Sequence, residues 1–161
     1  MIPSDVESGG EIIEVATGKV IAAKAPSVLR CSALGSCVAV VLSDKGKKVG
    51  GLAHVMLPSN EHVEGRDLKY SDHAITELVR QMVKLGARPG AIKARLVGGA
   101  HMLKDVQDVG KENIASIKRI LNTLKIRVTG ERIGGSESRS VLYDVLSGEV
   151  YVKEKENKFT I

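Results

Sequence analysis

Two short apolar runs, separated by a strong turn signal, constrain the fold of this chain more than any other feature. The first run, Cys37 to Ser43, consists almost entirely of β-branched or small apolar residues, which predicts a buried strand. Asp44-Lys45-Gly46 is a turn signal. Lys48 to Leu57 predicts a second strand, which Pro58 ends. Together they predict an antiparallel hairpin inside a β-sheet.

Two stretches carry the period of an amphipathic helix. The first follows Ser71, which can cap the helix, and ends at Gly86. Its apolar positions recur at i, i+3 and i+4, and they are Ala74, Ile75, Leu78, Val79, Met82 and Val83. The second helix is marked by Ile114, Ile117, Ile120, Leu121 and Leu124.

Further strands are predicted on both sides of these helices. Residues 11–31 predict one or two short strands, broken near Gly18 and around Pro26. Later strands are expected at 91–97 and 126–131, and a last hairpin at 141–145 and 149–153. The order is mixed rather than strictly alternating, so we expect an α+β fold with about seven to nine strands and two main helices.

The chain has 161 residues, which favours a single domain over residues 1–161. Residues 1–10 resemble a disordered lead-in. The run from Lys153 to Lys158 is charged, so residues 154–161 are expected to form a second flexible tail. No repeat, low-complexity tract or domain linker is evident.

Composition narrows the function. The net charge of +5 is modest, basic residues are scattered, and the chain has three Tyr, one Phe and no Trp for base stacking, so a nucleic-acid partner is not expected. An acidic protein partner fits the charge equally well. No apolar run approaches the length of a membrane helix, and the N-terminus lacks the pattern of a signal peptide. We expect a cytoplasmic protein whose two cysteines are free thiols.

Cys37 and His54 are the candidate catalytic pair, because a thiol within reach of an imidazole suits nucleophilic acyl chemistry. A two-residue hairpin turn would put Cys37 directly opposite His54. A three-residue turn would put it opposite Ala53, so that the two side chains point to opposite faces. The sequence leaves the register open.

Gly35 and Ser36 precede Cys37 and offer room for a substrate and backbone N–H groups for an oxyanion. The alternative is that Cys37 is a small core residue and His54 a structural histidine. Cys31, Cys37, His54 and His101 could be imagined around zinc, but they lack CxxC or HExxH spacing. Neither a metal nor another cofactor is expected.

Six motifs occur in order along the chain: Leu34-Gly35-Ser36-Cys37-Val38-Ala39-Val40, Ala53-His54-Val55-Met56-Leu57-Pro58, Lys69-Tyr70-Ser71-Asp72, Gly98-Gly99-Ala100-His101-Met102, Val109-Gly110-Lys111-Glu112-Asn113 and Gly134-Gly135-Ser136-Glu137-Ser138-Arg139-Ser140-Val141. Together they resemble the chemoreceptor glutamine deamidases of chemotaxis, the CheD family. The resemblance spans roughly residues 13–152.

The resemblance implies a cysteine-hydrolase fold of the toxin-deamidase type, with Cys37 as nucleophile and His54 as base. It implies that receptor glutamine side chains are converted to glutamate, and that a CheC-type phosphatase is a partner. His54 would take the Cys37 proton to form a thiolate–imidazolium pair, which would give Cys37 a low apparent pKa.

One position departs from the family pattern. The family's third catalytic residue is a threonine, and Cys31 stands there; Ala33 stands where a glycine is common. A thiol is a weaker hydrogen-bonding group than a hydroxyl. This departure leaves four alternatives. Cys31 orients the imidazole less well than a threonine would, Ser32 takes over that role, or the activity of the enzyme is weakened. In the fourth alternative, a Cys31–Cys37 disulfide inactivates the nucleophile under oxidation.

Two competing functions remain. One is a non-enzymatic regulator that docks to the phosphatase or receptor. The other is a cysteine hydrolase of a different amide.

Overall fold

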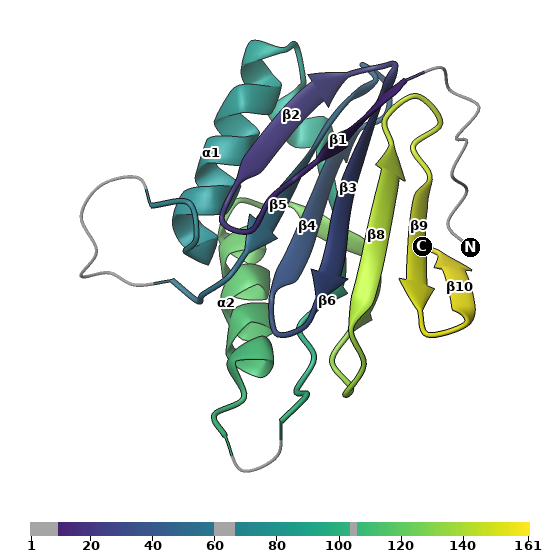
Figure 1. Ribbon diagram of the computed structural model, residues 1–161. Coiled ribbons are helices and arrows are strands. Elements are labelled where there is room, and N and C mark those ends of the chain that lie inside the picture. The colour runs from purple at the N-terminus through teal and green to yellow at the C-terminus, as the bar shows by residue number, and fades with distance from the viewer. Residues whose placement is uncertain (1–9, 60–66, 104–105) are drawn as a thin grey trace.

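The computed structural model describes residues 10–59, 67–103 and 106–161 (Figure 1). Within these ranges the chain forms ten strands, two α-helices and one short 3-10 helix. The strands are β1 (Glu11–Glu14), β2 (Val20–Lys24), β3 (Ser27–Leu34), β4 (Val38–Asp44), β5 (Val49–Val55), β6 (Lys93–Gly98), β7 (Arg127–Ile133), β8 (Arg139–Asp144), β9 (Val150–Glu154) and β10 (Asn157–Thr160). The helices are α1 (Ser71–Lys84), η1 (Pro89–Ala91) and α2 (Val109–Thr123).

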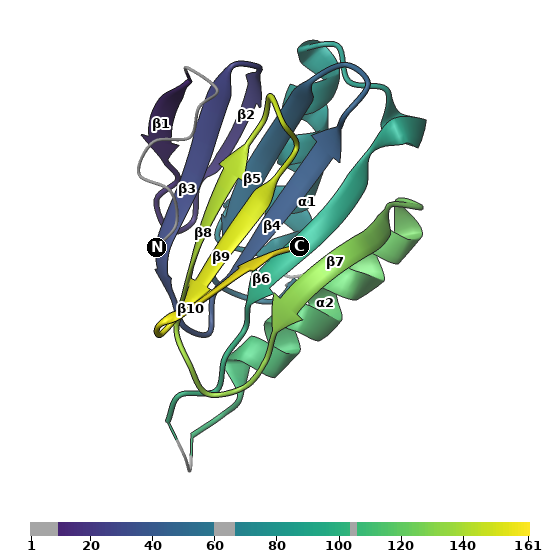
Figure 2. The ribbon, with the colours of Figure 1, turned by 90° about the vertical axis from the view of Figure 1, so that its right-hand side faces the viewer.

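The strands form two five-stranded sheets, ordered β1-β3-β8-β9-β10 and β2-β5-β4-β6-β7. Both are mixed, because β1 pairs with β3 and β6 pairs with β7 in parallel, while the other pairs are antiparallel. Both helices lie on the outer face of the second sheet, and the first sheet covers its other face (Figures 1 and 2). The expected α+β class is confirmed.

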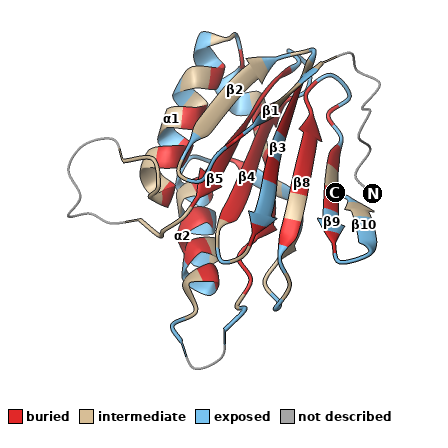
Figure 3. Cartoon of the chain, in the orientation of Figure 1, coloured by how far each residue is buried: buried red, intermediate tan, exposed pale blue. Residues whose placement is uncertain are grey.

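The central strand β4 is buried along its whole length (Figure 3). Val38, Val40 and Leu42 belong to the core beneath the helices, whereas Ala39 and Val41 belong to the core between the sheets. Successive strand residues point to opposite faces, so a strand covered on both sides needs apolar residues at every position. This explains the unbroken apolar run.

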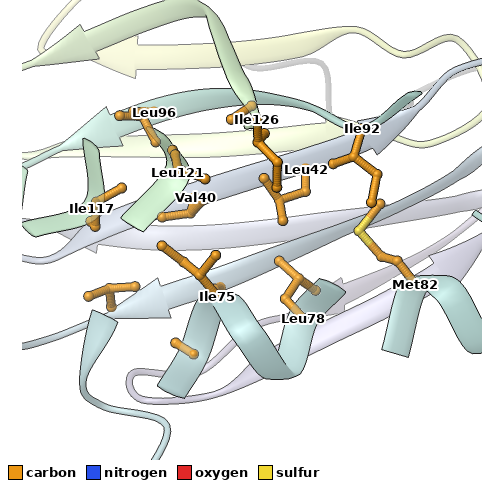
Figure 4. Close-up of a cluster of buried hydrophobic side chains, with 14 of the residues drawn as sticks. Val40, Leu42, Ile75, Leu78, Met82, Ile92, Leu96, Ile117, Leu121 and Ile126 are labelled. Carbon is orange, nitrogen blue, oxygen red and sulfur yellow. The ribbon is translucent and has the colours of Figure 1, made fainter. Parts of the chain in front are cut away.

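The helices supply the other half of the outer core (Figure 4). Ile75, Leu78 and Met82 of α1 and Ile117 and Leu121 of α2 are all almost fully buried there. Burying one such side chain contributes roughly 1.5–3 kcal/mol. In the part of the chain that the structure describes, no helix combines the length and apolarity needed to span a membrane.

The expected cap of α1 is wrong, although the ends of the helix are close to those expected. Ser71 is the first helical residue and Tyr70 takes the cap position. The Ser71 hydroxyl instead lies 2.6 Å from the Ser116 hydroxyl on α2, and both residues are buried. Gly86, at φ 105°, follows the helix as predicted.

The β4–β5 hairpin forms, but in neither expected register. Val38 pairs with Val55 and Ala39 with His54, and the ladder ends at Asp44 opposite Val49. The turn therefore has four residues, 45–48. The Asp44 carboxylate accepts the Lys47 N–H at 3.2 Å, and Lys48 adopts a φ of 52°. A lysine carries no signal for this left-handed conformation, which usually favours glycine or asparagine.

The strand count exceeds the expected seven to nine at two places. Residues 11–31 contain three strands, because the chain crosses between the sheets after β1. The C-terminal residues 157–160, expected in a flexible tail, form β10, which pairs with β9. Glu154, also expected in that tail, is buried and bound by Arg132 and Arg139. The charge of Glu154, which made a solvated tail the expected structure, is therefore neutralised by these two arginines. Residues 1–9 of the expected lead-in lie outside the described residues.

Candidate active site

Cys37 lies directly before β4, at the point where the chain enters the central strand. Its side chain is partly exposed and packs against the core between the two sheets. β4 fixes the position of its backbone, because the next residue, Val38, is paired with Val55 of β5 on one side and with Gly98 of β6 on the other. Cys37 is therefore anchored at the start of the buried central strand, while its side chain stays partly exposed.

Three successive backbone carbonyls around Cys37 each accept a hydrogen bond from the segment that follows β6 or from α2. The bonds are Ala100 N–H to Gly35 O, Asn113 Nδ2–H to Ser36 O and Gly99 N–H to Cys37 O, each 2.9 Å long. A loop whose carbonyls are all occupied in this way cannot rotate its peptide planes freely. The loop that carries the candidate nucleophile is thus preorganised.

The N–H groups of Ser36 and Cys37 are left open by this arrangement. In a trans peptide the carbonyl of one residue and the N–H of the next point in opposite directions. Pinning the Gly35 and Ser36 carbonyls therefore turns the Ser36 and Cys37 N–H groups away from Ala100 and Asn113. Neither N–H donates to another described residue. Two unpaired amide donors beside a thiol have the character of an oxyanion hole.

Gly98 allows the chain to approach Cys37 this closely. It has a φ of 116°, and a Cβ atom there would overlap the Cys37 carbonyl oxygen. Both the left-handed backbone and the close approach require glycine. The Gly98-Gly99 pair thus forms a tight backbone site behind the candidate nucleophile.

His54 lies on β5 opposite Ala39, on the side of the sheet that faces the inner core. Its ring is almost fully buried, and Nδ1 lies 3.1 Å from the Val15 carbonyl oxygen. A carbonyl can only accept, so Nδ1 carries the proton and Nε2 keeps its lone pair. That tautomer is the one a general base requires.

Cys31 lies on β3, fully buried, and its thiol donates to the same Val15 oxygen at 3.5 Å. Burial, first, and then the charges of Glu14 and Cys37 raise the pKa of the Cys31 thiol far above its usual range. Both cysteines are free thiols. The alternative in which Ser32 replaces the threonine finds no contact to support it: Ser32 is exposed, and its side chain makes no hydrogen bond with a described residue.

The resting state of Cys37 differs from the expected ion pair. Burial raises the pKa of its thiol, so the thiol is protonated at neutral pH. Within the described residues no hydrogen bond links Cys37 Sγ to the His54 ring. Catalytic hydrogen bonds are often long in apo structures and tighten when the substrate binds.

The sequence profile described as CheD chemotactic sensory transduction matches residues 56–154. A protein named probable chemoreceptor glutamine deamidase CheD from Methanococcus maripaludis (strain C6) is 41% identical over 147 residues, covering 89% of this chain and 95% of that protein. This chain belongs to the CheD family.

Other CheD proteins extend the similarity across archaea and bacteria. The probable chemoreceptor glutamine deamidase CheD of Thermococcus kodakarensis is 37% identical over 151 residues, covering 90% of this chain and 94% of the relative. The chemoreceptor glutamine deamidase CheD of Bacillus licheniformis is 36% identical over 156 residues, covering 92% and 93%. The suspected family is thereby confirmed.

A cavity of about 510 Å³ opens beside the candidate nucleophile of this CheD chain. Its lining runs from Ser36 to the segment after β6 and to the start of α2. Met102, Leu103 and Val106 line it and are 52%, 68% and 53% exposed. A substrate that reaches Cys37 from this side would meet an apolar wall.

Metal chemistry finds no ligand set in the described parts of this CheD chain. No three side chains of the His, Cys, Asp or Glu type gather there closely enough to hold an ion. His101, which could be imagined near zinc, instead has Nε2 3.1 Å from the Val106 carbonyl and Nδ1 3.7 Å from the Asp108 carboxylate.

Two groups at this CheD site were missed by the sequence analysis. The Val15 carbonyl orients His54, but a backbone acceptor leaves no mark on residue type. Asn113 was seen only as part of a motif that opens a helix. Its position beside apolar residues of an amphipathic helix was a usable signal, because a buried asparagine needs polar partners.

Proposed function

We propose that this protein converts glutamine side chains of methyl-accepting chemotaxis receptors to glutamate, with Cys37 as nucleophile and His54 as general base. The observation that carries the proposal is the β4–β5 register, which pairs Ala39 with His54, while Cys37, two residues before Ala39, packs against the same core between the sheets. A His54 ring with its proton on Nδ1, and Ser36 and Cys37 N–H groups that have no partner among the described residues, support it. CheD relatives that cover about nine-tenths of the chain carry the name glutamine deamidase.

The reaction begins from a neutral thiol. As Cys37 Sγ attacks the glutamine Cδ, His54 Nε2 takes the thiol proton, and the positive ring is stabilised by the Val15 carbonyl at Nδ1. The C=O electron pair moves onto oxygen, where the Ser36 and Cys37 N–H groups bind it. When the tetrahedral intermediate collapses, the C–N bond breaks, and His54 returns the proton so that ammonia leaves.

The second half of the reaction releases glutamate. Water attacks the thioester while His54 Nε2 takes its proton, and the C–S bond breaks to restore the Cys37 thiol. Each event replaces a neutral amide by a carboxylate on the receptor. A new negative charge on a helical receptor alters local repulsion, which can bias its signalling states.

Cys31 takes the third catalytic position in this proposal, as a positioning group. Its support is the shared Val15 acceptor, since a thiol that donates there restrains the same oxygen that holds His54. Cys37 and Cys31 as free thiols suit the reducing cytoplasm, which is the location we propose.

The decisive experiment uses the cognate receptor's cytoplasmic fragment and peptide mass spectrometry. Wild-type protein should add about 1 Da to specific receptor glutamines, the difference between an amide and an acid. Cys37→Ala should abolish the conversion, and His54→Ala should reduce it by about 100-fold or more with the fold retained. Undiminished conversion by Cys37→Ala would remove the nucleophile assignment.

Iodoacetamide separates an enzyme from a docking protein. In the folded chain Cys37 should be alkylated and Cys31 should not, because Cys31 is fully buried. His54→Ala should slow alkylation of Cys37. A protein that only docks would show a Cys37 rate independent of His54. A hydrolase of another amide would show the same alkylation pattern but leave receptor glutamines unchanged.

We also propose a CheC-type phosphatase as a second partner, because the family resemblance implies one. Exposed apolar side chains beside Ser36 are suited to a protein contact. Adding this protein to the phosphatase of the same organism should raise the phosphatase rate. An unchanged rate would eliminate this partner and leave the deamidase proposal standing.

A further inference from the structure

Asn113 of α2 connects the candidate nucleophile to the strand of the candidate base. It is fully buried, and its Nδ2 donates two hydrogen bonds, one to Ser36 O at 2.9 Å and one to Met56 O at 3.0 Å. Ser36 directly precedes Cys37. Met56 directly follows β5, two residues after His54. One amide nitrogen therefore bridges the two segments that carry the pair.

The bond to Ser36 sets the direction of the donor proposed for the oxyanion. Ser36 C=O and Cys37 N–H belong to the same trans peptide, so fixing the carbonyl oxygen aims the N–H the opposite way. Without Nδ2, this peptide plane loses its anchor. Its neighbours remain pinned by Ala100 and Gly99, so the change is confined to the plane between Ser36 and Cys37.

The bond to Met56 acts on the other partner. β4 and β5 pair as far as Val38 and Val55, and beyond that pair no strand pairing holds these two segments together. Asn113 links the two segments there instead, because the carbonyl oxygens of Ser36 and Met56 both accept a hydrogen bond from its Nδ2. The spacing of the Cys37 and His54 backbones at the open end of the hairpin thus depends on this amide.

The chemistry of the site calls for an amide in particular. Two carbonyl oxygens face the side chain, so it must supply two donors, and an ionised carboxylate supplies none. Oδ1 is buried and has no hydrogen-bond partner among the described residues. Burying a polar atom without a partner costs free energy. The two hydrogen bonds that Nδ2 donates are what offset this cost for an asparagine at position 113.

We infer that Asn113 is a positioning residue that holds the Cys37 peptide and the end of β5 in their reactive arrangement; this rests on the proposed function. Removing the two donors should lower kcat and leave KM nearly unchanged, since Asn113 is buried and out of reach of the substrate. We expect a kcat loss of about 10- to 100-fold for Asn113→Ala, somewhat less than the loss of an oxyanion donor itself.

Ser116→Ala is the matched control. Ser116 is buried on the same helix and also makes several hydrogen bonds, to Ser59 and Ser71, which tie α2 to other parts of the fold. Its loss should destabilise the protein without moving the catalytic loop. Thermal unfolding, kcat and the pH profile of Cys37 alkylation are measured on both variants.

Alkylation provides a readout that a merely structural role would not move. In Asn113→Ala the pH at which Cys37 reaches half its maximal alkylation rate should rise, because the Ser36–Cys37 peptide loses its anchor and its N–H no longer has a fixed direction in which to stabilise the thiolate. In Ser116→Ala that pH should stay at the wild-type value. A kcat within twofold of wild type together with an unchanged alkylation profile in Asn113→Ala would overturn the inference.

Asn113→Asp tests the donor requirement with the volume preserved. A protonated carboxyl can donate one bond, whereas an ionised one repels both carbonyls. The introduced group is buried against two carbonyl oxygens, so its pKa should be raised. Activity should therefore fall as pH rises through that pKa, at pH values where wild type is constant. A wild-type pH profile in this variant would contradict the inference, even if Asn113→Ala does not fold.

The two proposals fail separately. If wild type leaves receptor glutamines unchanged, the proposed function fails, and the alkylation comparison still decides whether Asn113 positions the Cys37 peptide. If wild type deamidates the receptor but both Asn113 variants match it in rate and profile, only the positioning role is wrong.

Discussion

Cys31 and His54 share one hydrogen-bond acceptor. The Cys31 thiol and His54 Nδ1 lie 3.5 Å and 3.1 Å from the same Val15 carbonyl oxygen, although they stand on different sheets. Val15 follows β1, where the chain crosses from the first sheet to the second. The crossover therefore locates the acceptor between the two sheets. In the proposed mechanism Cys31 would act on the imidazole through this backbone group.

This relationship predicts the effect of restoring the threonine. In Cys31→Thr a hydroxyl would donate to Val15 O more strongly than a thiol, and so fix the acceptor that orients His54. A hydrogen bond is worth about 1 kcal/mol, so we expect kcat to rise about fivefold. Steady-state deamidation of the receptor fragment measures this.

Cys31→Val is the matched control, because valine has the shape of threonine without the hydroxyl. It should show no gain in kcat. Equal rates for the two variants would mean that Cys31 is a packing residue and that the threonine position has no influence on His54.

The sequence predicted the elements well because periodicity reports burial. Both helices, the β4–β5 hairpin and the β8–β9 hairpin follow from apolar patterns and turn residues. It could not predict the register of β4–β5, because the turn depends on a left-handed Lys48 and on bonds that Asp44 makes. β10 was missed because its charged neighbour Glu154 is paired with arginines distant in sequence.

The sequence could predict only those parts of the candidate site that depend on the type of side chain. Cys37 and His54 stand out by their chemistry, and the resemblance to CheD proteins names them. The Val15 carbonyl and the open N–H groups are backbone features, which any residue could supply. The expected thiolate was also out of reach of the sequence, because the pKa of Cys37 depends on burial.

Ala33 offers a test of backbone strain next to the site. It has a φ of 55° in the irregular part of β3 between Cys31 and Leu34, a conformation that L side chains rarely adopt. Glycine adopts this conformation without a steric cost. Ala33→Gly should raise the free energy of unfolding by about 0.5–1 kcal/mol.

Urea unfolding measures the change as a higher midpoint with an unchanged slope. The control is Ala23→Gly in β2, where the backbone is ordinary and glycine should lower the free energy of unfolding. Destabilisation by both substitutions would show that the strain at Ala33 is absent in solution.

Asp44 stabilises the far end of β4. Its buried carboxylate accepts from Arg88 N, Nε and Nη2 and from Lys47 N, and the Arg88 guanidinium holds the pKa of this carboxyl well below its usual range. Asp44→Asn should therefore lower the free energy of unfolding by about 1–3 kcal/mol at pH 7.

The pH dependence has a definite sign. A lowered folded-state pKa contributes stability above the unfolded value of about 3.9, and that stability is lost as pH falls further. The difference between wild type and Asp44→Asn should thus be constant from about pH 5 to 8 and shrink below about pH 4. Glu131→Gln, which breaks an exposed pair with Lys118, should change the free energy of unfolding by less than about 0.5 kcal/mol.

The close contact between Gly98 and the Cys37 carbonyl predicts the effect of a substitution at Gly98. In Gly98→Ala the new methyl group would overlap the Cys37 carbonyl oxygen, so the loop must move and carry Cys37 with it. A misplacement of about 1 Å can cost 100-fold in rate, and we expect deamidation to fall by more than about 10-fold.

Gly86→Ala is the control, because Gly86 also has a positive φ of 105° but nothing lies within 4 Å of its Cβ position. It should be destabilised by strain alone and keep its kcat. Both variants are compared for kcat and for melting temperature, and equal activity in the two would mean that Cys37 does not depend on its contact with Gly98.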